Sequence, residues 1–141
     1  MRVAYQAGPR RWLLLPATAL VLSGLAAGCS SSKPAYCTDA ANLKTSVSNL
    51  GNVDVAKNGL SSLQTALSSV QTDASSFASD AKSAFPSQAT ALQNSLSGLG
   101  AAITSAKGQP PLTAAAAVAS SVAQVKTSAS AVQSAVSGTC Q

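Results

Sequence analysis

The sequence contains no histidine and no glutamate, and charged residues make up only 9% of its 141 positions. Aromatic residues account for 4%, and the four acidic residues are all aspartates. General acid–base and nucleophilic catalysis rely mostly on histidine, glutamate or a close pair of carboxylates. The composition therefore argues against an enzyme, and the length allows one small domain.

The formal net charge of +5 belongs mostly to the N-terminus. Arg2, Arg10 and Arg11 lie within the first 11 residues, whereas lysines and aspartates nearly balance after Gly28. The lysines are scattered, and neither arginines nor aromatic residues are interleaved with them. The sequence therefore does not predict nucleic-acid binding.

Residues 1–28 have the layout of a secretory signal peptide, with arginines first, then an apolar run, then small residues. The apolar run extends from Trp12 to Leu22 and is interrupted by Pro16. It is well short of the roughly 20 residues that a membrane-spanning helix needs. We therefore predict that residues 1–28 direct export and are then removed.

The end of this segment, Leu25-Ala26-Ala27-Gly28-Cys29, resembles the lipobox of bacterial lipoproteins. The family prefers leucine three places before the cysteine, where this chain has Ala26, with Leu25 one place further back. The resemblance implies that the Cys29 thiol carries diacylglycerol and that a peptidase cleaves before it. The mature chain would then be anchored on the extracytoplasmic face of the cell membrane. The alternative is an ordinary signal peptide followed by an unmodified Cys29.

Residues 10–14, with the sequence RRWLL, resemble the twin-arginine export motif, which a receptor reads. Pro9 stands where that motif usually has serine or threonine. A plain positive N-terminal region explains the same arginines, so both export routes stay open.

Beyond Cys29 the chain has two further cysteines, Cys37 and Cys140, near the two ends of the mature region. Thiols outside the cytoplasm meet oxidising conditions and pair. A Cys37–Cys140 bridge would close a loop of about 100 residues and contribute at most about 4–5 kcal/mol in the chain-entropy model. Two free thiols or a metal pair are the alternatives, but the lack of histidine and of a third ligand disfavours a metal.

The mature region is rich in alanine and serine, which raises disorder as an alternative. However, its net charge is low, and apolar residues recur with alternating spacings of three and four. Such a spacing is typical of amphipathic helices with one buried face. The predicted helices cover residues 36–50, 54–84, 87–107 and 113–137.

Several residues are predicted to set the helix boundaries. Asp54 and Thr113 are candidate N-caps, and Gly138 is predicted to end the last helix. Gly59 is unfavourable inside a helix by about 1 kcal/mol relative to alanine. Its position suggests that the second helix begins near Leu60.

Short connections place successive helices antiparallel, so we predict an all-α, up-down-up-down four-helix bundle over residues 36–141. Residues 29–35 would form the lipidated cysteine and a short polar tether. In this topology Cys37 and Cys140 lie at the same end, which agrees with their pairing. The first predicted helix is much shorter than the second, so either the far end has three helices or the second helix bends.

The lipobox, the alanine- and serine-rich helices and the two further cysteines together resemble small lipoproteins of high-GC Gram-positive bacteria. This resemblance implies no particular activity. The first hypothesis is a lipid-anchored structural or protein-interaction module of the cell envelope, with a membrane anchor, an envelope protein as partner, and no cofactor, metal or nucleic acid. Asp73 and Asp80 share a helix face and are interpreted as surface charges.

The alternative function is a carrier or sensor that holds an apolar small molecule between the helices. Phe77, in the predicted second helix, and Phe85, directly after it, are large side chains that would form the walls of the apolar pocket. The same two residues also suit a simpler role as anchors of the hydrophobic core.

Overall fold

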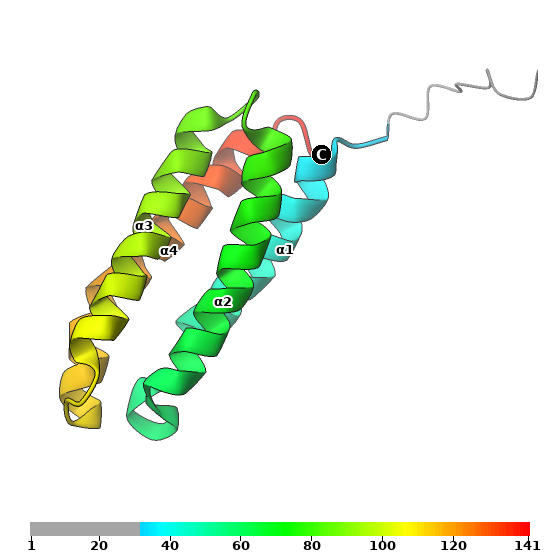
Figure 1. Ribbon diagram of the computed structural model, residues 1–141. Coiled ribbons are helices and arrows are strands. Elements are labelled where there is room, and N and C mark those ends of the chain that lie inside the picture. Colours follow the sequence, from blue (N-terminus) through cyan, green and yellow to red (C-terminus); the bar gives the residue numbers. More distant parts are fainter. Residues whose placement is uncertain (1–31) are drawn as a thin grey trace, which may run out of the picture. The chain divides into compact units, whose positions relative to one another are not determined.

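The computed structural model describes residues 32–141, which form four antiparallel helices in up-down-up-down order (Figure 1). The predicted signal peptide, 1–28, and Cys29 lie outside the described residues. The prediction of an all-α four-helix bundle is confirmed. The helices are α1 (Ala35–Gly51), α2 (Val55–Ala81), α3 (Pro86–Ala106) and α4 (Pro111–Val136).

The bundle closes because α1 packs against α4 as well as against α2. The pairs α2–α3 and α3–α4 also pack together, and α2 and α4 touch across the bundle. The helix that begins the described region and the helix that ends it are therefore neighbours. Because α1 and α4 are adjacent and antiparallel, the start of α1 and the tail after α4 lie at the same end of the bundle (Figure 1).

The core follows the apolar stripes of the sequence and is built largely from small side chains. Phe77 is its largest fully buried residue, among leucines, valines and alanines. Alanine buries little area at about 25 cal/mol per Å², but it lets helices approach closely. On α4 the buried residues are Ala114, Val118, Val125, Ala129, Val132 and Val136.

One of the predicted N-caps is correct and the other is wrong. The Asp54 carboxylate accepts a hydrogen bond from the backbone N–H of Lys57 at 3.1 Å, as predicted for the start of α2. Thr113, however, does not cap α4, which already begins at Pro111 and has no side-chain cap. Proline suits the first helical position because its φ is preset and its missing N–H needs no partner there.

The last helix ends close to the predicted position, near Gly138. The helix ends at Val136 and Gly138 follows two residues later, so the predicted position holds. The left-handed conformation common for a glycine at this place is not adopted, because the described glycines with positive φ are Gly59 and Gly108. The backbone N–H groups of Thr139 and Cys140 both donate to the Val136 carbonyl instead.

The second helix bends at Gly59, which has φ 75° and ψ 174°. Residues 55–58 form a first turn, and the long part of α2 begins at Leu60, as the sequence suggests. Val55 in that first turn is buried, and it lines a small hollow together with Leu50 and Val118. The bend therefore covers the far end of the bundle, where the shorter α1 has already stopped at Gly51.

Candidate functional site

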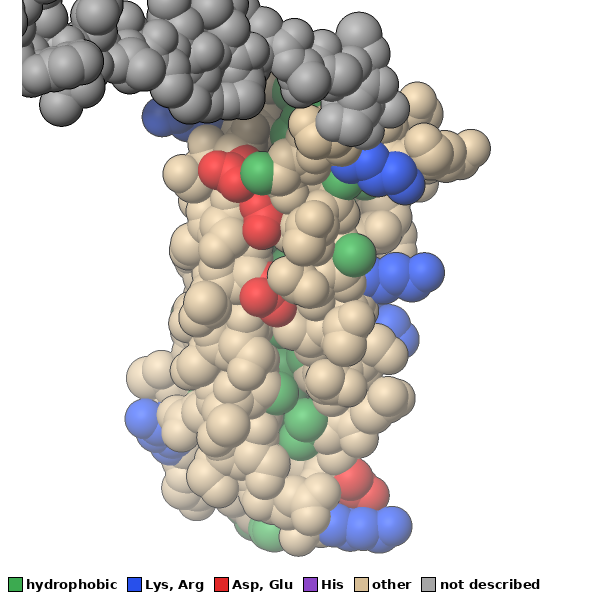
Figure 2. Space-filling view, turned by 90° about the vertical axis from the view of Figure 1, so that its right-hand side faces the viewer, with side chains coloured by type: hydrophobic (Ala, Val, Ile, Leu, Met, Phe, Trp, Pro, Cys, Tyr) green, Lys and Arg blue, Asp and Glu red, His purple; other side chains and the backbone are tan. Residues whose placement is uncertain are grey.

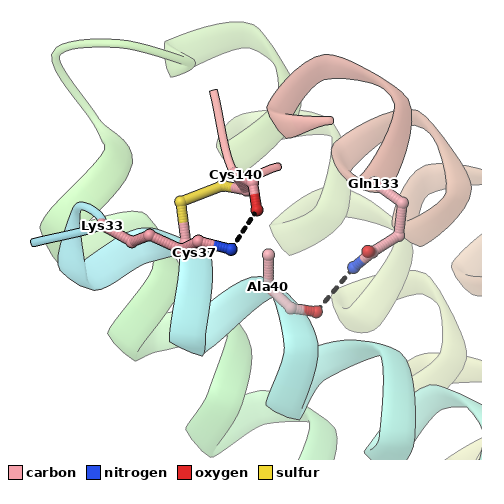
Figure 3. Close-up of a disulfide and its surroundings, with 5 residues drawn as sticks. All are labelled: Lys33, Cys37, Ala40, Gln133 and Cys140. Atoms are coloured by element: carbon pink, nitrogen blue, oxygen red, sulfur yellow. Dashed lines mark hydrogen bonds between the residues drawn. A yellow bond between two sulfur atoms is a disulfide. The ribbon is translucent and has the colours of Figure 1, made fainter. Parts of the chain in front are cut away.

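A disulfide joins the two ends of the bundle's chain (Figure 3). Cys37 lies in the first turn of α1 and Cys140 in the tail after α4, with a sulfur–sulfur distance of 2.04 Å. Their Cα atoms are 5.4 Å apart, although 103 residues separate them in sequence. The predicted pairing is therefore present, and these two cysteines are neither free thiols nor a metal pair.

Two hydrogen bonds support the same junction. The Lys33 ammonium donates to the carbonyl oxygen of Cys140 at 2.9 Å, and the Gln133 side-chain amide donates to the carbonyl oxygen of Ala40 at 2.6 Å (Figure 3). With the disulfide, these contacts fix the start of α1 to the end of α4. We call this region the clamped end; it consists of Lys33, Cys37, Ala40, Gln133 and Cys140.

A shallow groove runs from the clamped end along the seam between α1 and α4. It consists of two hollows of about 680 and 440 Å³ that share Lys44, Ser48 and Gln133. Among the described residues, Lys44 and Lys126 are the charged side chains in its lining, and Gln141 lines the first hollow. We call this feature the α1–α4 groove.

The two lysines of the groove are spaced along the bundle axis. The Lys126 side chain lies against α1 at Gly51, with its Cδ 3.4 Å from the position that a Cβ would take there. Gly51 is seven residues, or two helical turns, below Lys44 on α1. At 1.5 Å per residue, the levels of Lys44 and Lys126 therefore differ by about 10 Å.

The seam between α1 and α2 carries the opposite charge (Figure 2). Asp39 on α1 faces Asp80 and Asp73 on α2, and we call these three residues the acidic strip. Burial raises the pKa of Asp39, and the hydrogen bond and negative charge of Asp80, with the charge of Asp73, raise it further. The Asp39 Oδ2 atom is buried without a hydrogen-bond partner.

The sequence interpretation paired Asp73 with Asp80 but missed Asp39. The signal was available in the antiparallel order of the helices, because the first turns of one helix then lie beside the last turns of the next. Asp39 is in the second turn of α1 and Asp80 in the last turn of α2. Within residues 32–141, the strip does not form a cluster of three or more ligands arranged to hold a metal ion.

The one ion pair formed within the described part of the chain lies elsewhere. Lys57 and Asp54 approach to 3.4 Å in the first turn of α2, with side chains 81% and 44% exposed. An exposed pair of this kind contributes little to stability. Among residues 32–141, the acidic strip and the lysines of the α1–α4 groove have no ion-pair partner.

The two phenylalanines lie in different surroundings. Phe77 is 0% exposed in the core, whereas Phe85 is half-buried and packs edge-on against Tyr36 with ring centroids 5.4 Å apart. Neither residue lines any of five well-formed hollows in the described part of the chain. The structure therefore gives both a packing role, and the predicted apolar pocket stays without structural support.

Many serine and threonine hydroxyls donate hydrogen bonds to backbone carbonyls of their own helix. Ser62, Ser68 and Ser75, for example, each donate to the carbonyl four residues earlier, at 2.8–3.1 Å. Ser95 and Ser128 bond to one another at 2.6 Å across the seam between α3 and α4. These hydroxyls bond to backbone carbonyls or to another serine hydroxyl rather than to a basic side chain of the described residues.

In comparisons with known proteins, no protein-family model, curated protein or solved structure matches the chain. None of the helices within residues 32–141 combines the length and the apolar character that crossing a membrane requires. The fold therefore defines the class of the protein: an all-α four-helix bundle whose two ends are joined by a disulfide.

Proposed function

We propose that the protein is a lipid-anchored structural or protein-interaction module on the outer face of a bacterial cell membrane. The observation that carries this proposal is the position of Cys29. It follows an export-signal layout directly and precedes Ala35, the first residue of α1, by six positions. A lipid on Cys29 would therefore attach to the chain just before the folded region begins.

The disulfide supports a location outside the cytoplasm. Thiols in the cytoplasm are kept reduced, and structural disulfides are typical of exported proteins. Residues 30–34 span at most about 20 Å when fully extended. The clamped end, which includes Lys33 and Cys37, would then stand next to the membrane, with the long axis of the bundle leading away from it.

The surface supports binding rather than chemistry. The groove and the strip present lysines, aspartates, amides and small hydroxyl side chains, and many hydroxyls are already bonded to their own helix. The exposed large hydrophobic residue in the described region is Leu112, at the end opposite the clamp. Nothing in the described hollows favours the alternative, a carrier of apolar molecules.

Fractionation of producing cells tests the anchor. We expect the wild-type protein in the membrane fraction, released by detergent but not by salt, and accessible to protease added to cells whose wall has been removed. Cys29→Ser should move the protein out of the membrane fraction, whether or not residues 1–28 are removed. Cys37→Ser/Cys140→Ser serves as the matched control, because it also removes thiols but leaves the anchor. A wild-type chain in the soluble fraction would contradict the proposal.

A second test addresses the interaction role. A photoreactive amino acid introduced at exposed Ser48 or Asn94 should give discrete cross-linked products with envelope proteins in living cells. The same amino acid at buried Val70 should give none, because that position is closed to partners. An absence of discrete products at every exposed position would count against an interaction module.

A further inference from the structure

The α1–α4 groove and the acidic strip match each other in charge and in spacing. Along the bundle axis, Lys44 and the Lys126 side chain differ in level by about 10 Å. Asp73 and Asp80 are seven residues apart on α2, which is also about 10 Å along the bundle. One chain therefore presents two positive positions on one seam and negative positions with the same separation on another.

We infer that the α1–α4 groove binds the acidic strip of a second copy of this chain. Lys44 and Lys126 of one copy would face the carboxylates of the strip on the next, with the small side chains of the two seams in contact. The small side chains of Ala41, Ser48 and Ser130 line the groove, so they leave room for a helix to approach closely.

The electrostatics of the strip favour a cationic partner. Asp39, Asp73 and Asp80 repel one another, and no lysine of the described chain forms an ion pair with them. Within residues 32–141, the two lysines of the groove likewise form no ion pair. Contact between two copies would pair both sets of charges at once.

The contact joins different surfaces of the two copies, so it is heterologous. After one contact has formed, each copy still has a free strip or a free groove. Repeated contacts of this kind form a closed ring if the rotation from one copy to the next adds up to a full turn, and an open row of copies if it does not. This inference concerns the folded bundle alone and holds whether or not Cys29 carries a lipid, so its failure is distinguishable from failure of the proposed anchor.

A zero-length carbodiimide cross-linker provides the first test, because it joins a lysine to a carboxylate only where the two touch. Full-length chains labelled with heavy and with light nitrogen are mixed and treated at low salt. We expect mixed heavy–light peptides that join Lys44 or Lys126 to Asp73 or Asp80. Raising the ionic strength to about 0.5 M should suppress them, since exposed charge pairs are screened by salt.

Matched variants provide the second test, read as the concentration dependence of sedimentation. Lys44→Gln/Lys126→Gln should weaken self-association about tenfold, and Asp73→Asn/Asp80→Asn should do the same. Lys57→Gln/Lys107→Gln changes the net charge equally outside the groove and should leave association as in the wild type. All the lysines changed are exposed, and circular dichroism verifies that each variant folds.

A mixture of the two association-deficient variants gives the sharpest result. One retains only the strip and the other only the groove, so the mixture should form one-to-one dimers and nothing larger. Cross-links only within single copies, or a mixture that stays monomeric, would overturn the inference. Equal loss in the Lys57→Gln/Lys107→Gln control would also overturn it, as would a groove that binds added polyglutamate while copies of the chain do not associate.

Discussion

Cys37 and Cys140 lie side by side at the clamped end, with their Cα atoms 5.4 Å apart. Their bond closes a loop that contains almost the entire bundle. The core inside that loop consists mainly of small side chains, each of which buries little area. We therefore expect the bundle to depend on this bond more than a bundle of leucines would.

The first prediction follows from this dependence. Cys37→Ser/Cys140→Ser should lower the free energy of unfolding by about 2–5 kcal/mol, as is usual for a native disulfide in a small exported domain. Urea unfolding followed by circular dichroism measures the change. Cys29→Ser is the control and should unfold like the wild type. A bridge-free variant as stable as the wild type would show that packing alone holds the bundle.

The second prediction concerns Asp39 and pH. The pKa of Asp39 is raised above its ordinary value of 3.8 by burial and by Asp80 and Asp73. A raised pKa in the folded state means that protonation of Asp39 favours folding. This stabilisation is fully present below pH 3.8 and is lost as the pH rises through the raised pKa.

Asp39→Asn replaces the ionisable carboxyl by a neutral amide, so the loss of stability that accompanies ionisation of Asp39 no longer occurs. At neutral pH the variant should be more stable than the wild type by about 0.5 kcal/mol, and the difference should vanish near pH 3. Unfolding curves at a series of pH values measure it. Asp54→Asn is a suitable control, since asparagine caps a helix about as well as aspartate. A less stable Asp39→Asn variant at neutral pH would indicate that the carboxylate is stabilising.

The third prediction tests the bend in α2. Gly59 has φ 75° and ψ 174°, a conformation that is essentially restricted to glycine. Gly59→Ala should therefore cost about 1–3 kcal/mol. Gly98→Ala is the matched control, because Gly98 is helical with nothing within 4 Å of its added Cβ, and it should gain up to about 1 kcal/mol. Equal effects of the two substitutions would show that Gly59 is not a bend.

The fourth prediction distinguishes core residues from pocket walls. Phe77→Ala should lower the free energy of unfolding by about 3–5 kcal/mol, because the ring is fully buried. Phe85→Ala should cost clearly less, because the ring is half-buried against Tyr36. Thermal and urea unfolding measure both. Retained stability in Phe77→Ala, combined with lost binding of an apolar dye, would favour the carrier alternative.

The helices were predictable because their apolar residues repeat with helical spacing. The four predicted segments agree with α1–α4 to within three residues at each boundary. The bend was also predictable, because glycine is unfavourable inside a helix and Gly59 lies near the start of the second segment. The prediction that Thr113 caps the last helix was wrong because α4 begins earlier, at Pro111, whose preset φ suits the first helical position.

The surfaces were less predictable than the core. Asp39 lies beside Asp80 only because α1 packs on α2, and Lys44 and Lys126 line one hollow only because α1 packs on α4. Sequence spacing describes one helix face at a time, so it cannot show which faces of two helices adjoin. The pairing of Cys37 with Cys140 was the exception, because the predicted lipidation of Cys29 left one partner for each of the other two cysteines.

Mass spectrometry of the protein isolated from the membranes of producing cells tests the central claim most directly. We predict a mature N-terminus at Cys29 carrying diacylglycerol and, in the same digest, a peptide that joins Cys37 to Cys140. A chain that retains residues 1–28 in the cytosol, with Cys29 unmodified and Cys37 and Cys140 as free thiols, would contradict the account.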